Sequence, residues 1–355
     1  MESILSTNYY VHFQEKSYSA FINYMNNNFH SKVIVLVDSN TREYCLPHFV
    51  NKIDSAKHFE IIEISAGEKY KTLETCIDLW NKLNQLGADR KSLLVNLGGG
   101  VITDMGGFVA STFKRGIKFI NIPTTLLSMV DASVGSKTGV DLGVLKNHVG
   151  LFSNPEIVLI DTHFLNTLPE RELRSGLAEI IKYGFTFDKN IWDIIKTWKG
   201  VDYQLINDLV FRSVEIKNKV VLKDQRENNL RKSLNFGHTI GHAIESYFLE
   251  TEDKKSLTHG EAIAIGMVIE LYYSSNLFNF PKKNTDELKT FVHNFFGKTI
   301  IEISDYDRII ELMQYDKKNV NGKVNFVLLK KMEDCIMDVQ VNDQLIMEGL
   351  QYYQK

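Results

Sequence analysis

Short runs of apolar and β-branched residues alternate with helical patterns through the first half of the chain. Four such runs lie at Val33–Val37, Glu60–Ile64, Leu93–Leu97 and Phe119–Ile122. Between two of them, a helical pattern from Leu73 to Leu86 stops at Gly87. Continuous apolar strands separated by helices are typical of a parallel sheet that is covered on both faces. The first half is therefore predicted to be an α/β domain.

The strand pattern fades after about Asp161, and the helical patterns become longer. Thr167 to Glu170 has the form of a capping box that opens a helix through Tyr183. Further helices are predicted for Tyr203–Lys223 and Glu261–Ser275. We expect a Rossmann-like α/β domain over residues 1–163 and a mostly α-helical domain over residues 164–355. The active site is expected in the cleft between them.

Composition and charge narrow the class of protein. A chain of 355 residues with 44% hydrophobic content can bury two cores, and a net charge of -3 does not favour non-specific nucleic-acid binding. The apolar runs are too short to cross a bilayer, and no secretory signal pattern opens the chain. The three cysteines, Cys45, Cys76 and Cys335, are too far apart for a thiolate zinc motif. We expect a cytoplasmic enzyme that acts on a small molecule and binds neither nucleic acid nor membrane.

The segment Leu234 to His242 places two histidines, His238 and His242, four residues apart on one helical face. This spacing is a common way for a helix to present imidazoles to one metal ion. His259 follows and Glu179 precedes them, and together these side chains can fill the shell of a divalent metal while leaving a position for substrate. The spacing alone leaves open whether both His238 and His242 bind metal or one of them transfers protons.

Gly98, Gly99 and Gly100 lie where a predicted strand turns into a helix. Glycines at this place allow a phosphate to approach the backbone, and the helix N-terminus favours its negative charge. The motif is not the dinucleotide fingerprint G-x-G-x-x-G, so a tight turn explains it equally well. Asp38 and Asn40 follow an earlier strand and are suited to a ribose, although ordinary turn chemistry accounts for them too.

Several basic residues are embedded among small and apolar neighbours, where a solvated surface charge is not required. They are Arg115, Lys137, Lys146, Lys182, Lys217 and Arg231. Phosphate and carboxylate groups are commonly held by such side chains. The set therefore indicates a substrate with more than one anionic group.

Taken in order, these segments resemble the 3-dehydroquinate synthase family over most of the chain, from Asp38 to about Asn319. The matching stretches in the first half are Gly67–Lys71, Gly98–Val101, Phe108, Arg115-Gly116, Pro123–Leu127 and Asp131–Gly135. Those in the second half are Thr167–Glu172, Ala178-Glu179, Lys182, Leu234–His242, His259-Gly260 and Asp316–Lys318. Each piece alone is weak, and their order and spacing carry the resemblance.

The resemblance implies that Glu179, His238 and His259 bind a divalent metal, zinc or cobalt, and that His242 takes part in proton transfer. Lys182 is expected beside the substrate hydroxyls. The residues expected around the anionic groups of the substrate are Lys217 and Arg231 for the carboxylate, and Lys137, Asn147, Asn235 and either Lys317 or Lys318 for the phosphate. Arg115 is expected to reach the site of a neighbouring subunit, which would make a homodimer the functional form.

The same resemblance implies that residues 1–163 form an NAD-binding domain and that residues 164–355 form a metal- and substrate-binding domain. The NAD site would be formed by many short segments of the first half. Its residues are Asp38, Asn40, Glu68, Lys71, Gly99, Gly100, Asp104, Thr124, Thr125, Asp131, Lys137, Lys146 and Thr167. The chain departs from the usual family pattern at Ser136 and Leu145, where most relatives have glycine. We interpret both as variations in loop shape. The segment from Glu250 to Thr258 is expected to be a longer loop than in many relatives.

The implied reaction belongs to the shikimate pathway of aromatic biosynthesis. A lyase of this family converts 3-deoxy-D-arabino-heptulosonate 7-phosphate to 3-dehydroquinate and phosphate by transient oxidation, elimination, re-reduction and aldol closure. One alternative is a metal-dependent polyol or alcohol dehydrogenase, which would release NADH and would not need so many cationic side chains. Another is a sugar phosphate cyclase whose substrate lacks the carboxylate, which would leave Lys217 and Arg231 without a partner. A non-catalytic binding module would be expected to lack at least one metal ligand or cationic residue of this set, and none is missing.

Overall fold

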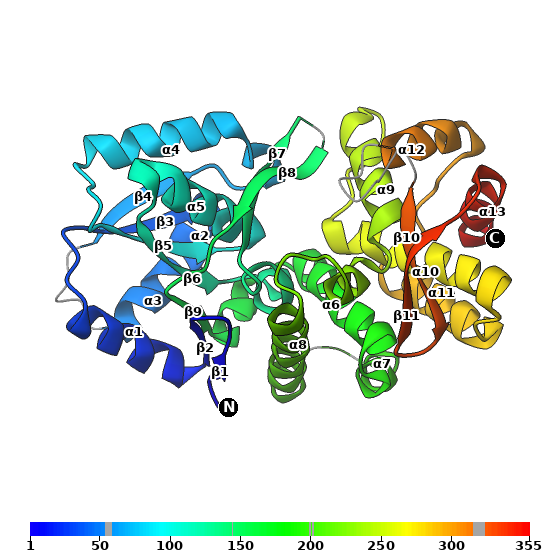
Figure 1. The fold of residues 1–355 in the computed structure, drawn as a ribbon, viewed down its shortest axis with the longest axis horizontal. Coiled ribbons are helices and arrows are strands. Elements are labelled where there is room, and N and C mark those ends of the chain that lie inside the picture. The colour runs from blue at the N-terminus through cyan, green and yellow to red at the C-terminus, as the bar shows by residue number, and fades with distance from the viewer. Residues whose placement is uncertain (54–58, 144, 199, 201, 315–323) are drawn as a thin grey trace. The chain divides into compact units, whose positions relative to one another are not determined.

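The structure is a computed structural model that describes residues 1–53, 59–143, 145–198, 200, 202–314 and 324–355. The chain divides into two compact units (Figure 1). Unit 1 comprises Met1–Leu173 and Asp202–Asn218, and unit 2 comprises Arg174–Val201 and Lys219–Lys355. The assignment of an NAD-binding and a metal-binding domain on either side of residue 163 stays a prediction.

A seven-stranded sheet lies at the centre of unit 1, with the order β1-β2-β9-β6-β5-β3-β4. The strands are β1 (Ile4–Leu5), β2 (Tyr10–Phe13), β3 (Val33–Asp38), β4 (Glu60–Ile64), β5 (Leu93–Gly98), β6 (Lys118–Pro123) and β9 (Ile157–Ile160). Only β1 pairs antiparallel within this sheet, and all the other pairs are parallel. All four predicted strands are present, which confirms the prediction of an α/β fold with a parallel sheet.

Helices cover the sheet because alternate residues of each strand point to opposite faces. Ile34, Leu36 and Leu94 share one buried cluster with residues of α4 (Leu73–Gln85) and α5 (Gly100–Thr112). Val35 and Val95, on the other face, are fully buried as well. The remaining helices of this unit are α1 (Glu15–Asn27), α2 (Ser39–Tyr44), α3 (Leu46–Lys52) and the first part of α8 (Tyr203–Lys223). The continuous apolar runs therefore reflect burial on both sides.

Unit 2 is mostly helical, as predicted. Its helices are most of α6 (Glu170–Thr186), α7 (Lys189–Ile195), α9 (His238–Glu250), α10 (His259–Phe278), α11 (Lys282–Phe295), α12 (Tyr306–Met313) and α13 (Asp343–Gln354). Within the described ranges, no helix combines the length and the apolar character that crossing a membrane requires.

Two antiparallel hairpins were not predicted. In unit 1, β7 (Lys137–Leu142) pairs with β8 (Leu145–Phe152), and in unit 2, β10 (Asn325–Lys331) pairs with β11 (Asp334–Gln340). Gly139 and Gly150 of the first hairpin lie so close that a Cβ on Gly150 would meet the Thr138 carbonyl oxygen at 2.2 Å. Such glycines and the polar residues between them interrupt the apolar alternation that identifies a strand.

The capping box predicted at Thr167 is wrong. Thr167 is the last residue of a short 3-10 helix, η4 (Thr162–Thr167), and its hydroxyl donates to the Phe164 carbonyl. Leu168 is extended, with φ -74° and ψ 127°, because the residue before a proline avoids the helical conformation. Helix α6 therefore begins only at Glu170, after Pro169.

Candidate active site

Three helices of unit 2 bring a carboxylate and two imidazoles together. Glu179 lies in the middle of α6, whereas His238 and His259 are the first residues of α9 and α10. Gly237, with φ 79°, starts α9 in the left-handed conformation that glycine adopts without strain. Thr258 and Glu261 form a capping box that starts α10. The local sequence therefore fixes where both histidines lie on their helices.

Glycines let the backbones of these helices approach closely. A Cβ on Gly266 of α10 would lie 2.0 Å from the Gly237 carbonyl oxygen, and a Cβ on Gly260 would lie 2.1 Å from the Ser175 carbonyl oxygen of α6. In addition, the Gly260 N–H donates to the Ser175 hydroxyl at 2.9 Å, and the Gly237 N–H donates to the buried Glu270 carboxylate at 2.7 Å. The backbone of α10 is thus in direct contact with that of α6 and with the start of α9, beside Glu179, His238 and His259.

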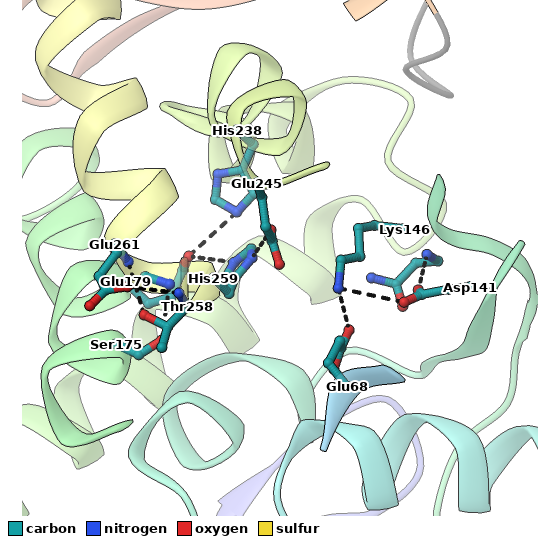
Figure 2. A network of polar contacts seen from close by, with 12 residues as sticks. Glu68, Asp141, Lys146, Ser175, Glu179, His238, Glu245, Thr258, His259 and Glu261 are labelled. Carbon is teal, nitrogen blue, oxygen red and sulfur yellow. Dashed lines mark hydrogen bonds and ion pairs between the residues drawn. The ribbon is translucent and has the colours of Figure 1, made fainter. Parts of the chain in front are cut away.

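Both imidazoles point their Nε2 atoms at the same carboxylate oxygen. Oε1 of Glu179 lies 3.4 Å from Nε2 of His238 and 3.3 Å from Nε2 of His259 (Figure 2). Glu179 is completely buried, and neither of its oxygens accepts a hydrogen bond of regular geometry from a described residue. Its Oε2 atom forms an ion pair with the ammonium of Lys182, which is itself buried.

The other ring nitrogens define the tautomers of the two histidines. Nδ1 of His238 lies 3.0 Å from the Phe236 carbonyl oxygen, and Nδ1 of His259 lies 3.2 Å from Oε2 of Glu245. A carbonyl and a carboxylate can only accept, so each Nδ1 carries the proton. In the neutral rings, Nε2 therefore directs a lone pair toward Oε1 of Glu179.

Burial and neighbouring charges shift the pKa of Glu179 and of both histidines. Burial alone would raise the pKa of Glu179, but the Lys182 ammonium and the His238 and His259 imidazoles hold it well below its usual 4.5. Burial lowers the pKa of His238 despite the nearby carboxylate. The pKa of His259, which burial would lower, is raised to about 10 because the carboxylates of Glu179 and Glu245 face its two ring nitrogens.

These donor atoms fit a divalent metal. Two ligand atoms that each lie about 2.1 Å from a tetrahedral zinc ion are about 3.4 Å apart. The distances between Oε1 of Glu179 and the two Nε2 atoms, 3.3 and 3.4 Å, match this spacing. Two lone pairs and a carboxylate oxygen that face one another repel unless a cation lies among them. The residues present therefore suit zinc or cobalt, with two nitrogen ligands and one oxygen ligand.

His242 lies next to the same cluster, one helical turn after His238. The ligand atoms of His238, His242 and His259 all lie within 4.8 Å of one another. The ring of His242 is 5.2 Å from that of His238 and 5.6 Å from that of His259, measured between centroids. Proximity to the cluster is thus compatible with either of the roles that the sequence left open for His242.

A second polar network lies in unit 1, where several of the predicted NAD residues meet. Lys71 is buried and donates to Asp104 at 2.7 Å and to the side chain of Asn147 at 2.6 Å. Burial alone would lower the pKa of Lys71, but Asp104 and neighbouring carboxylates raise it. Lys146 donates to Glu68 at 2.9 Å and lies 3.6 Å from Asp141 (Figure 2). The sequence thus identified residues that the fold brings together here.

The carboxyl ends of the parallel strands carry most of the other predicted NAD residues. Gly98 lies opposite Pro123 in the sheet, and the Thr124 N–H donates to the Gly98 carbonyl at 3.0 Å. Gly99 precedes α5, and a Cβ added to it would meet Thr125 at 2.8 Å. Position 99 therefore suits glycine, because the backbone before α5 packs closely against Thr125.

Asp38 is the last residue of the neighbouring strand β3, and Asn40 lies in α2, which follows it. Asp38 accepts a hydrogen bond from the Thr41 N–H and so caps α2, while Asn40 is exposed. The capping bond is the turn chemistry that the sequence left as an alternative for Asp38. Thr167, at the end of η4, completes the predicted set.

The residues predicted to bind the substrate anions fall into both units. Unit 1 contains Arg115, which is exposed, together with Lys137, Asn147 and Lys217. Lys217 donates to the Asp131 carboxylate at 2.7 Å, so a residue predicted for the substrate and one predicted for NAD form an ion pair. Lys317 and Lys318 lie outside the described residues.

In unit 2, Arg231 and Asn235 belong to the 3-10 helix η5 (Leu230–Asn235) and are both buried. Arg231 donates to the Gln225 carbonyl at 2.7 Å, and Asn235 donates to Glu227 at 2.6 Å. The loop that precedes η5 is held by Asp224, whose carboxylate accepts from the backbone of Arg231. These contacts fix the two side chains within the same unit as the metal-ligand candidates.

Three polar residues near the networks were missed from the sequence. Glu245 contacts His259, Ser175 contacts the start of α10, and Asp141 accepts from the backbone N–H of Asn147 at 2.7 Å. Glu245 had a detectable signal, since it follows His238 and His242 at helical positions i, i+4 and i+7. Ser175 contacts a segment that is far away in the sequence, and Asp141 acts within the β7–β8 hairpin, which was itself not predicted.

Comparison with known proteins places the chain in a family. Residues 61–175 match the model of the 3-dehydroquinate synthase N-terminal region, and residues 176–319 match that of the C-terminal region. A 3-dehydroquinate synthase of Parabacteroides distasonis is 42% identical over 328 residues, which cover 92% of this chain and 92% of that protein.

Two solved sugar phosphate cyclases share the fold. A 2-deoxy-scyllo-inosose synthase complexed with carbaglucose-6-phosphate, NAD+ and Co2+ matches with a TM-score of 0.84 and 24% identity, covering 99% of each chain. A 2-epi-5-epi-valiolone synthase of Streptomyces hygroscopicus, with NAD+ and Zn2+ bound, matches with a TM-score of 0.85 and 24% identity, covering 100% of this chain and 99% of that one. The two family models, which together span residues 61–319, and the 42% identity to a curated relative show that this chain belongs to the 3-dehydroquinate synthase family.

Proposed function

We propose that this chain converts 3-deoxy-D-arabino-heptulosonate 7-phosphate to 3-dehydroquinate and phosphate, with NAD and a divalent metal as cofactors. The observation that carries the proposal is the convergence of two imidazole Nε2 atoms on Oε1 of Glu179, in a chain of this family. Glu179, His238 and His259 would hold the metal, as their spacing supports. When bound, the metal polarises a substrate hydroxyl and NAD accepts and returns a hydride, so the net reaction is that of a lyase.

Two residues of the metal cluster would act on the substrate directly. His242 would accept and return protons, since its ring lies beside the rings of the proposed ligands His238 and His259. Lys182 would lie beside the substrate hydroxyls, where its ammonium donates hydrogen bonds. Because Lys182 is buried against Glu179, its positive charge also offsets the buried carboxylate.

The cationic and amide side chains would bind the anionic groups of the substrate. We assign Lys217 and Arg231 to its carboxylate, and Lys137, Asn147, Asn235 and Lys317 to its phosphate. Lys318 is the alternative to Lys317. A substrate with both a phosphate and a carboxylate supports this assignment, because both groups are commonly bound by such side chains. Arg115, which is exposed, would contribute to the site of the neighbouring subunit of a homodimer.

The NAD site would lie at the carboxyl ends of the strands of unit 1, the usual position of ligands in parallel sheets. The start of α5 at Gly99 and Gly100 suits a pyrophosphate. The remaining residues that we assign to it are Asp38, Asn40, Glu68, Lys71, Asp104, Thr124, Thr125, Asp131, Lys137, Lys146 and Thr167. This site corresponds to the NAD-binding domain that we propose for residues 1–163, with the metal- and substrate-binding domain at 164–355. A cytoplasmic location is proposed on the family resemblance alone.

The first experiment is to incubate the purified chain with the heptulosonate phosphate, Zn2+ and NAD, and to follow phosphate and NADH together. Release of phosphate without net NADH is the expected result, because the hydride is returned. Accumulation of NADH on simple polyols, with no phosphate release, would assign the chain to the dehydrogenases. Glucose 6-phosphate serves as the control substrate, since turnover of this sugar phosphate would show that the carboxylate is not required.

The roles of the histidines are tested by metal content. Glu179→Ala, His238→Ala and His259→Ala are each expected to lose bound zinc, whereas His242→Ala is expected to keep zinc and lose turnover. Stoichiometric zinc in all three ligand variants would contradict the ligand assignment. Loss of zinc from His242→Ala would instead make His242 a ligand.

A further inference from the structure

The two histidines of the cluster differ in what holds their Nδ1 atoms. His238 donates to a neutral backbone carbonyl, that of Phe236, at 3.0 Å. His259 donates to a carboxylate, Oε2 of Glu245, at 3.2 Å (Figure 2). A charged acceptor makes the opposite ring nitrogen a stronger electron-pair donor than a neutral acceptor does. The two nitrogens that face Glu179 are therefore chemically unequal.

Glu245 reaches His259 from another helix. It belongs to α9, three residues after His242 and seven after His238, so all three side chains lie on one face. Its side chain is buried, with an exposed fraction of 6% for the residue. The Glu245 carboxylate thus extends from α9, whose first residue is the proposed ligand His238, to the imidazole of the other proposed histidine ligand, His259.

The backbone around His259 is fixed by different contacts. The Thr258 and Glu261 capping box and the bond from the Gly260 N–H to Ser175 hold the start of α10. These contacts set the position of the His259 Cα but leave the ring free to rotate about its side-chain bonds. The contacts that fix the ring plane are those of its two nitrogens, to Glu179 and to Glu245.

We propose that Glu245 is a positioning residue for the metal centre: it keeps the proton of His259 on Nδ1, aims Nε2 at the metal and strengthens that nitrogen as a ligand. The inference rests on the metal site of the proposed function and adds to it a residue outside the ligand set. Removing such an outer carboxylate typically weakens metal binding 10- to 100-fold.

The test measures the zinc dissociation constant of the full-length chain by competition with a chromophoric chelator, without any turnover. Three variants are compared with the unchanged chain. Glu245→Ala removes the acceptor and is expected to bind zinc about 10- to 100-fold more weakly. Glu245→Gln keeps an oxygen that accepts from Nδ1 but removes the charge, so its affinity is expected to fall between the two. Glu261→Gln is the matched control, because the Glu261 carboxylate accepts from the Thr258 backbone and glutamine can do the same.

A second measurement uses the visible ligand-field absorption of the cobalt-loaded chain, which responds to the orientation of the ligands. Both Glu245 variants are expected to change this spectrum, and Glu261→Gln is expected to leave it unchanged. A role of Glu245 in packing alone would lower thermal stability in the metal-free chain without altering the spectrum of the loaded one.

The outcomes separate this inference from the proposed function. If the unchanged chain binds neither zinc nor cobalt, the metal site fails and the role of Glu245 fails with it. If the unchanged chain binds zinc and Glu245→Gln binds it equally tightly with the same cobalt spectrum, only the role of Glu245 is overturned. Because glutamine has the shape of glutamate, this variant decides the matter even if Glu245→Ala does not fold.

Discussion

Gly266→Ala tests whether the backbone contact between α9 and α10 determines the geometry of the metal site. The added Cβ would lie 2.0 Å from the carbonyl oxygen of Gly237, whereas ordinary contacts of a Cβ begin at 3.4 Å. The two backbones must therefore separate by about 1.4 Å at this point. Metal–ligand distances tolerate changes of only about 0.2 Å. Gly237 directly precedes His238, so the separation would carry one proposed ligand away from the others.

The expected result is a fall of more than tenfold in zinc affinity together with a loss of about 1–3 kcal/mol in the free energy of unfolding, the usual cost of overpacking. Chelator competition measures the first quantity and denaturant unfolding of the metal-free chain measures the second. Gly349→Ala is the matched control. Its Cβ would meet the side chains of Tyr273 and Ile269 in α10 instead of a backbone atom, so it should cost stability but leave zinc affinity unchanged. Unchanged zinc affinity in Gly266→Ala would refute the reasoning.

Three further predictions concern metal removal, thiol reactivity and pH. Chelation is expected to lower the thermal midpoint of the unchanged chain, because the metal binds only the folded site, and to leave that of Glu179→Ala unaffected; scanning calorimetry with and without chelator measures both. Cys45 and Cys76 should resist alkylation at pH 8 until the chain is unfolded, since burial raises the pKa of each thiol to about 12; rapid modification of the folded chain, detected by mass spectrometry, would contradict this. Burial would raise the pKa of Asp305, but Lys254, Tyr247 and a backbone N–H lower it below 3.8. The stability that it contributes is present above pH 3.8 and is lost as the pH falls through the lower folded value, so the difference between the unchanged chain and Asp305→Asn should shrink in acid.

Four strands of the sheet, β3 to β6, could be predicted from their continuous apolar runs, whereas β1, β2 and β9 were not predicted. The hairpin β7–β8 could not be predicted, since Gly139 and Gly150 approach each other backbone to backbone and leave no side-chain pattern. The start of α6 was placed too early because a threonine three residues before Glu170 fits the capping pattern, although Pro169 keeps Leu168 extended. Local patterns thus predict many elements, but they fail where a residue such as Pro169 restricts the backbone conformation of the residue before it.

The metal cluster, like the secondary structure, could be predicted only in part. The spacing of His238 and His242 is a local signal, and the structure brings His259 and Glu179 beside them. The sequence could not show that Gly237 and Gly266 touch, because nothing in either segment encodes its contact with the other. Nor could it show that Lys217 and Asp131 form an ion pair, since that contact depends on where α8 packs within unit 1.

The discontinuity of unit 1 has a consequence for how the chain folds as it is synthesised. The residues Asp202–Asn218 complete this unit, but Arg174–Val201, which belong to unit 2, are made before them. Until that late segment emerges from the ribosome, the edge of the sheet lacks the ring contact of Phe13 with Phe211 and the hydrogen bond from Asn218 to the Leu5 carbonyl. Domains made early usually fold before later ones are complete. Here the nascent N-terminal region cannot complete its packing until residues 202–218 have been synthesised. A gene cut after Leu173 would therefore yield a fragment that exposes part of its own core.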